Sequence, residues 1–199
     1  IDGQLYIVQA RPITSFSSQE HHLKDYQIKS KGRLLTTGRS VGYGLGIGTA
    51  KIIKHLDDMY LIDEGDILVT DHTDPNWEPV MQKTSAIITN KGGRTCHAAI
   101  IARELGIPAV VGCLDATTKI QNQSTISVSC AEGDQGFIYQ GSIEYELIAK
   151  HIESLPNITT KIMINIGNPD RAFYFAQIPN EGVGLARIEF IINRMIGVH

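Results

Sequence analysis

The feature of this sequence that most constrains its fold is a pair of glycines followed directly by an amphipathic segment. Gly92 and Gly93 allow the backbone to turn sharply just before residues 95–105. Within that segment one apolar face recurs at helical spacing, formed by Ala98, Ile101, Ala102 and Leu105. Gly106 supplies a stop, and Pro108 follows it. The pattern predicts a helix over 95–105 with a single apolar face.

Short runs rich in Ile and Val surround this helix. Bounded by Gly, Asp and Asn, they predict strands over 48–53, 66–70, 86–89, 108–111, 125–129 and 136–139. Pro75 indicates a short helix over 77–83, because proline is favoured in a first helical turn. The mixture favours a compact α/β domain, to which we assign residues 32–150. The glycine-rich run 42–48 lacks the Gly-Lys-Ser/Thr ending of a phosphate loop, so we interpret it as a turn that enters a strand.

The flanks of this domain differ from it in composition. Residues 15–31 are polar with few apolar anchors, and residues 151–161 contain a Pro-Asn pair, so both segments are interpreted as linkers. Residues 1–14 read as strand-like, and residues 162–199 open with an apolar run. The chain lacks an initiator Met and stops just after an apolar run. We therefore expect a fragment with a piece of a further domain at each end.

Composition argues against several classes of function. The chain has 199 residues, 18 basic and 21 acidic, and its net charge of -3 is too balanced to indicate a nucleic-acid or membrane partner. No apolar run reaches the ~20 residues that span a bilayer, and no signal peptide is recognisable. Cys96, Cys113 and Cys130 are an odd, scattered set. We therefore expect free thiols in a reducing cytoplasm, with Cys96 a small packed residue.

His97 stands where the predicted helix begins. The first-turn N–H groups of a helix carry partial positive charge, so together with Gly92 and Gly93 they form a potential anion site. Arg94 adds a charge that can fork onto phosphate oxygens, and Thr95 can cap the helix or donate to an oxygen. A neutral imidazole in such a site is a good nucleophile near neutral pH. The same residues also fit a histidine that merely caps or packs, and the local pattern alone favours that interpretation.

A longer string reverses that preference. The 21 residues Gly92–Gly112 closely resemble the phosphohistidine signature of the phosphoenolpyruvate (PEP)-utilising enzymes. The resemblance implies a swivelling β/β/α domain in which the residue that matches His97 carries a phosphoryl group on Nε2. It also implies that the residues just before the histidine support the phosphate: Gly92, Gly93, Arg94 and Thr95.

The N-terminal flank resembles a neighbouring domain of the same family. Gln9-Ala10-Arg11-Pro12 is similar to the last strand of an ATP-grasp nucleotide-binding domain. Residues 1–14 would then be the end of such a domain, with Arg11 on the nucleotide phosphates. A structural salt bridge of Arg11 is an equal alternative.

The C-terminal flank resembles the opening of the PEP-binding (β/α)8 barrel. The similarity lies in Glu181–Phe190 and implies that residues 162–199 begin that barrel. In the family, the arginine that matches Arg187 binds the phosphate of PEP, and a guanidinium at a strand end suits that role. The alternative for Arg187 is a surface ion pair with Glu189.

Together the flanks favour the branch of the family that makes PEP. The resemblance implies that ATP, pyruvate and water give AMP, PEP and phosphate, with Mg²⁺ held by parts of the enzyme outside this chain. The acidic turns at 63–64 and 71–74 are interpreted as solvated carboxylates, and we assign no metal here. The implied partners are the nucleotide-binding and barrel domains of the same polypeptide, and a homodimer through a further domain stays open.

Three alternatives remain at this point. The first is a related phosphohistidine enzyme, such as a dikinase that uses free phosphate instead of water. The second is a non-catalytic carrier module that is phosphorylated in trans. The third is a structural domain in which His97 only packs. In every case the fragment alone is not expected to turn over, because most of each neighbouring domain is missing.

Overall fold

The computed structural model describes residues 22–151, 159–167, 172, 176, 179–188 and 192. Its centre is a closed barrel whose strands are hydrogen-bonded in the order β2-β6-β5-β4-β3-β7-β8. These strands are β2 (Leu34–Val41), β3 (Leu45–Ile52), β4 (Ile67–Thr70), β5 (Ala86–Thr89), β6 (Ala109–Val111), β7 (Thr125–Ser129) and β8 (Gln135–Gln140). The four strands from β3 to β6 pair in parallel, and the remaining pairs are antiparallel.

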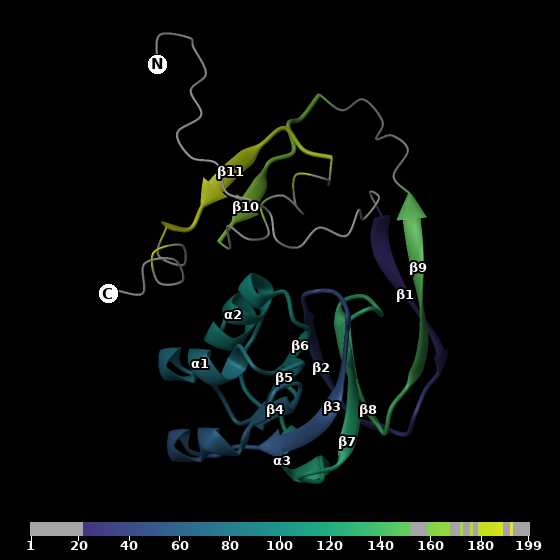
Figure 1. Ribbon diagram of the computed structural model, residues 1–199, viewed down its shortest axis with the longest axis vertical. Helices are drawn as coiled ribbons and strands as arrows, with labels where there is room; N and C mark the ends of the chain where they lie inside the picture. Colours follow the sequence, from purple (N-terminus) through teal and green to yellow (C-terminus); the bar gives the residue numbers. More distant parts are fainter. Residues whose placement is uncertain are drawn as a thin grey trace.

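Short helices cover part of the barrel, with α1 and α2 on the side opposite the β1–β9 ribbon in Figure 1. The helices are η1 (Leu56–Leu61), η2 (Pro75–Trp77), α1 (Glu78–Met81), α2 (His97–Leu105) and α3 (Ala116–Lys119). The expected helix over 95–105 is confirmed as α2, two residues shorter at its start. The helix ends at Gly106, which has a left-handed φ of 74° that glycine adopts easily.

The expected α/β class needs a correction, because the domain is mostly β. The six predicted strands are all present: β5 and β7 have the expected bounds, and the other four have shifted ends. β2 was not expected and is what closes the barrel between β6 and β8. Its central residues are Thr, Gly, Arg and Ser, so it offers no apolar run to recognise. Threonines nevertheless suit a pleated strand, because a β-branched side chain packs well there. The run 42–48 is confirmed as the turn that leads from β2 into β3.

Two hydrophobic clusters stabilise the barrel, one on each face of the parallel strands. The inner cluster gathers side chains from strands around the barrel, including Ile67, Val69, Ile88, Val110, Ile126 and Ile138. The outer cluster joins Leu68 and Ile87 to side chains of α1 and α2. Strand β4 is buried at all four positions because alternate residues face the two clusters. On α2 the small side chains Ala98, Ala99 and Ala102 are fully buried, so the helix lies close against the sheet.

A two-stranded antiparallel ribbon leaves the barrel, formed by β1 (His22–Ser30) and β9 (Glu144–His151). The segment 15–31, expected as an irregular linker, therefore contains a strand. Tyr26 of the ribbon lies 5.8 Å, between ring centroids, from Tyr43 in the β2–β3 turn and 5.8 Å from Tyr145. The proposed nucleotide-domain residues 1–14, with Arg11, and the rest of the first linker lie outside the described residues.

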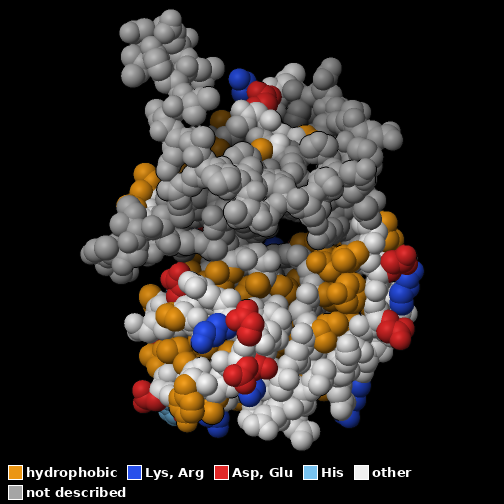
Figure 2. All heavy atoms as spheres, in the orientation of Figure 1, with side chains coloured by type: hydrophobic (Ala, Val, Ile, Leu, Met, Phe, Trp, Pro, Cys, Tyr) orange, Lys and Arg blue, Asp and Glu red, His pale blue; other side chains and the backbone are white. Residues whose placement is uncertain are grey.

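The C-terminal part contributes a small parallel pair, β10 (Ile164–Ile166) and β11 (Val183–Ala186). Figure 1 shows this pair beyond α2, apart from the barrel. β10 lies within the apolar run that opens residues 162–199. On the face shown in Figure 2, acidic and basic side chains lie intermixed on the carrier region. In the part of the chain that is described, no helix is long and apolar enough to cross a membrane.

Candidate phosphoryl-carrier site

Three loops meet at one edge of the barrel, because the carboxyl ends of neighbouring parallel strands point the same way. The loop after β4 begins at Asp71, the loop after β5 at Asn90, and the loop after β6 at Gly112. His97 lies at the end of the middle loop, as the first residue of α2. Side chains from the outer loops can therefore reach the imidazole.

Asn90 ties these three loops together. Its Nδ2 donates to Thr117 Oγ1 at 2.7 Å and to Asp71 Oδ1 at 3.4 Å. Its Oδ1 accepts from Thr117 N at 3.1 Å, and its backbone oxygen accepts from Leu114 N at 2.9 Å. Asn90 itself is buried. A buried amide with this many partners fixes the loops relative to one another.

Gly92 is required by the shape of the middle loop. Its φ of 108° lies in the region that side chains rarely adopt, and a Cβ there would meet Cys96 Sγ at 2.7 Å. The loop continues through a turn in which Cys96 N donates to Gly93 O at 3.0 Å. Cys96 then becomes the N-cap residue of α2, without a side-chain cap bond. Gly93 has open space around it, so only the first glycine of the pair is sterically necessary.

The imidazole of His97 is half-buried and oriented by a threonine from the neighbouring loop. Thr73 Oγ1 lies 3.1 Å from His97 Nδ1. When Nδ1 carries the ring proton it donates to that hydroxyl, and the lone pair is on Nε2. In that tautomer Nε2 is the nucleophilic nitrogen of the ring.

Burial is the main influence on the pKa of His97. It lowers the pKa below the usual value, because desolvation disfavours the charged imidazolium. The carboxylates of Glu78 and Asp74 act in the opposite direction and raise it. The outcome is a lowered pKa, so the nucleophilic neutral form predominates near neutral pH.

The residues expected to support a phosphate lie beside His97, but not all of them point to it. The Arg94 guanidinium pairs with Asp134 Oδ1 at 2.7 Å, in the loop between β7 and β8. Thr95 is exposed and precedes the N-cap residue, so it does not cap the helix. Lys91, which the sequence analysis did not select, pairs with Asp71 at 2.7 Å and lowers the pKa of that carboxyl.

Sequence reasoning missed the two side chains that bear most directly on the imidazole. Thr73 belongs to the acidic turn 71–74 that was interpreted as solvated, and Glu78 opens α1. The available signal was position: the turn directly follows a buried strand beside the strand that leads to His97. Loops after neighbouring parallel strands meet at one edge, so this rule could have selected Thr73.

Arg187 lies at the end of β11, where its backbone N donates to Ile166 O at 2.8 Å. Its Nη1 lies 3.1 Å from Glu104 Oε1, near the end of α2. The alternative partner, Glu189, lies outside the described residues. Arg187 is thus not gathered with His97, and its role toward PEP stays a prediction.

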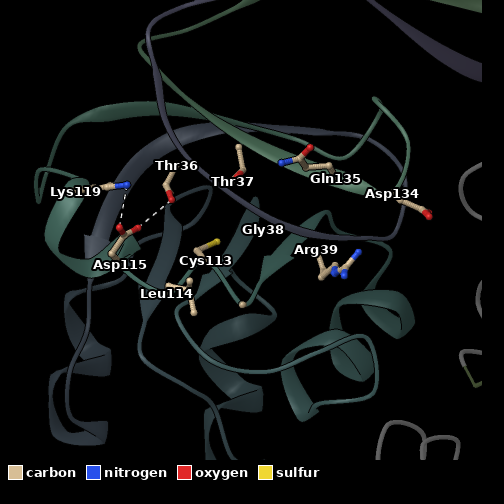
Figure 3. A pocket seen from close by; sticks show the side chains of 11 residues that line it. Thr36, Thr37, Gly38, Arg39, Cys113, Leu114, Asp115, Lys119, Asp134 and Gln135 are labelled. Atoms are coloured by element: carbon tan, nitrogen blue, oxygen red, sulfur yellow. Dashed lines mark hydrogen bonds and ion pairs between the residues drawn. The ribbon is translucent and has the colours of Figure 1, made fainter.

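A polar hollow of about 680 Å³ lies on the same edge of the barrel as the His97 loop. Figure 3 shows Asp115 bonded to Lys119 and Thr36 on one side of it, with Arg39 and Asp134 on the other. His97 is not among the residues that line it. Asp134, which pairs with Arg94, links the hollow to the loop before His97.

All three cysteines are free thiols, as the sequence predicted. Burial raises the pKa of Cys113 to about 12 and raises that of Cys130, so both stay protonated and inert. Cys96 packs against the outer core cluster. Among the described residues, no group of three or more His, Cys, Asp or Glu side chains is placed to hold a metal ion.

Comparison with known proteins identifies the domain. Residues 62–133, which include β4, α2 and His97, match the family described as PEP-utilising enzyme, mobile domain. The part of the barrel from β4 to β7, with its histidine at the start of α2, therefore matches the mobile domain of PEP-utilising enzymes.

The whole chain is homologous to phosphoenolpyruvate synthases. It is 57% identical to that of Pseudomonas aeruginosa (strain UCBPP-PA14) over 199 residues, which is 100% of this chain and 25% of that protein. It is 56% identical to that of Escherichia coli (strain K12) over 197 residues, 99% of this chain and 25% of that protein. Among solved structures it is similar to an Enzyme I protein, at 29% identity and a TM-score of 0.35, over 40% of this chain and 33% of that one. The chain spans about a quarter of the length of the curated relatives it matches.

Proposed function

We propose that this chain carries a phosphoryl group on Nε2 of His97, as the mobile domain of a phosphoenolpyruvate synthase. The observation that supports this most directly is the contact between His97 Nδ1 and the Thr73 hydroxyl. In the tautomer in which Nδ1 donates to Thr73, the lone pair is on Nε2, and the lowered pKa of the half-buried ring favours the neutral form.

The chemistry follows from this arrangement. Nε2 attacks the β-phosphorus of ATP, the bond from that phosphorus to the α-phosphate oxygen breaks, and AMP leaves. Water then removes the outer phosphate, and the remaining phosphoryl group passes to the enolate oxygen of pyruvate to give PEP. During these steps the Nδ1–H group stays hydrogen-bonded to the Thr73 hydroxyl. The partial positive charge at the start of α2 stabilises the anionic phosphoryl group. Mg²⁺ would neutralise phosphate charge from sites outside the described residues.

The nucleotide and pyruvate sites of such an enzyme are on different domains, so the carrier must move between them. We propose that residues 15–31 and 151–161 join it to an ATP-grasp domain, which ends in 1–14, and to a barrel that begins in 162–199. Arg11 would contact the nucleotide and Arg187 the phosphate of PEP. The ribbon β1–β9 supports a concerted swing, because most of the first connection is paired with the last strand of the domain, which ends at His151 where the second connection begins. The whole enzyme would act in the cytoplasm.

The central test is phosphorylation of the full-length protein with ATP and Mg²⁺, followed by mass spectrometry under conditions that preserve phosphohistidine. The mass of a phosphoryl group should appear on His97 and be lost on brief acid treatment. The variant His97→Ala should give no label, while His55→Ala, which removes an exposed histidine before η1, should retain it. Full overall activity of His97→Ala would contradict the proposal.

Two further measurements separate the remaining alternatives. Dependence of PEP formation on free phosphate as a substrate would indicate a dikinase. Label that forms only with a second protein would indicate a carrier phosphorylated in trans. A crosslink that holds the carrier to one neighbouring domain should abolish overall turnover and spare one half-reaction; survival of both half-reactions would rule out the swing.

A further inference from the structure

The end of α2 remote from His97 makes a contact that the phosphoryl-carrier function does not use. Glu104 Oε1 lies 3.1 Å from Arg187 Nη1, and the Glu104 side chain is only 18% exposed. Glu104 is in the last turn of the helix, where the carbonyl ends carry partial negative charge. A carboxylate in that position is stabilised by a cation from outside the helix, which here is the guanidinium of Arg187.

The same carboxylate lies over the carboxyl edge of the β10–β11 pair. Gly167 directly follows β10, and a Cβ built on Gly167 would overlap the Glu104 carboxylate. Arg187 directly follows β11 and is hydrogen-bonded through its backbone to Ile166. Ligands of parallel α/β structures bind at this edge of the strands, so Glu104 occupies a place where a substrate anion belongs.

The contact also holds Arg187 away from the phosphoryl carrier. Glu104 follows His97 by seven residues of α2, which corresponds to about 10 Å along the helix axis. A guanidinium that assists transfer must lie on the phosphoryl group itself, beside Nε2 of His97. Arg187 therefore cannot hold Glu104 as seen here and serve the transfer at the same time.

We propose that Glu104 is a placeholder for the substrate phosphate: it holds Arg187 in a parked position on α2, and PEP must displace it. This inference rests on the proposed function, because the role of Arg187 as a phosphate ligand belongs to that function. The carrier and the substrate then compete for one guanidinium, so a barrel without PEP retains the carrier and a barrel with PEP releases Arg187 to the substrate.

The test uses the full-length enzyme and the isosteric variant Glu104→Gln. PEP-dependent phosphorylation of His97 should show a KM for PEP about threefold to fivefold lower than wild type, because the Glu104 carboxylate no longer competes with the PEP phosphate for Arg187. AMP formation from ATP, which does not involve Arg187, should stay within about twofold. The matched control is Glu132→Gln, which removes an ion pair with Lys31 inside the carrier domain and should leave both half-reactions unchanged.

A second measurement isolates the binding of PEP from the transfer of the phosphoryl group. In a His97→Ala background, calorimetric titration with PEP should show the dissociation constant falling by the same factor when Glu104→Gln is added. An unchanged or raised KM or dissociation constant for PEP, in a variant that melts at the wild-type temperature, overturns the placeholder. If the wild-type enzyme forms phosphohistidine from ATP but not from PEP, both inferences about Arg187 fail; if it forms none from either, the proposed function itself fails.

Discussion

The two ends of α2 hold their functional side chains by different means. At the start, His97 is fixed by backbone geometry and by neutral contacts: a glycine at positive φ, a packed cysteine and a threonine hydroxyl. At the end, Glu104 forms an ion pair with Arg187, a residue 83 positions away in the sequence. The first arrangement is built into the domain, whereas the second depends on a segment outside it.

This difference matters because the two kinds of contact respond differently to motion. Packing and backbone contacts within one domain travel with it, so under the proposed swing the geometry around His97 would stay the same in every position of the domain. An ion pair between two parts of the chain can break and be replaced by water or by another anion at low net cost. The start of α2 is thus suited to constant chemistry, and its end to an exchangeable contact.

The largest effect is expected from substitutions in the glycine pair before α2, which test whether backbone geometry fixes the start of the helix. Gly92→Ala places a Cβ against Cys96 Sγ at a φ of 108°, and should destabilise the domain by about 1–3 kcal/mol. Gly93→Ala meets open space and should change stability by less than about 0.5 kcal/mol. Urea unfolding of the 199-residue chain measures both. Equal effects would show that the loop is not fixed by Gly92.

The next largest effect should come from the threonine that orients the ring. Thr73→Val keeps the shape and removes the hydroxyl, so the rate of phosphohistidine formation in the full-length enzyme should fall about fivefold to tenfold. Thr73→Ser retains the hydroxyl and should recover most of the rate. A Val variant as fast as wild type would mean that the Nδ1 contact does not prepare Nε2.

A smaller change is expected in the pH dependence of the same step. Because burial lowers the pKa of His97, the acid limb of phosphorylation by ATP should lie below pH 6.5, the usual imidazole value. Glu78 raises this pKa, so Glu78→Gln should move the limb further toward acid pH. The rate of phosphohistidine formation, measured by quenched reactions at a series of pH values, gives the acid limb of the wild-type enzyme and of the variant. A shift toward neutral pH in the variant would contradict the assigned sign.

The smallest effect should come from the ion pair next to the site. Arg94 and Asp134 are 44% and 87% exposed, so their coupling should be less than about 1 kcal/mol. A double-mutant cycle with Arg94→Ala and Asp134→Ala, followed by urea unfolding, isolates that coupling. A larger value would place Arg94 among the fixed contacts at the start of α2 and reduce its freedom to meet a phosphate.

Local sequence pattern was enough for the elements that depend on nearest neighbours. The helix after Gly92-Gly93, its stop at Gly106 and the buried strands are each encoded within about a dozen residues, by spacing and by backbone preference. His97 also followed from sequence, because a long signature surrounds it. These features needed no knowledge of what lies across the domain.

Only the tertiary structure decided the contacts that join distant segments. Strand β2 closes the barrel although its residues form no apolar run, Thr73 reaches His97 from a neighbouring loop, and Glu104 meets Arg187. Each depends on which strands pair and in what register, and that choice is made by the whole barrel at once. The sequence alone predicted His97 as the nucleophile; only the fold placed Thr73 beside its Nδ1 and Arg187 at the other end of its helix.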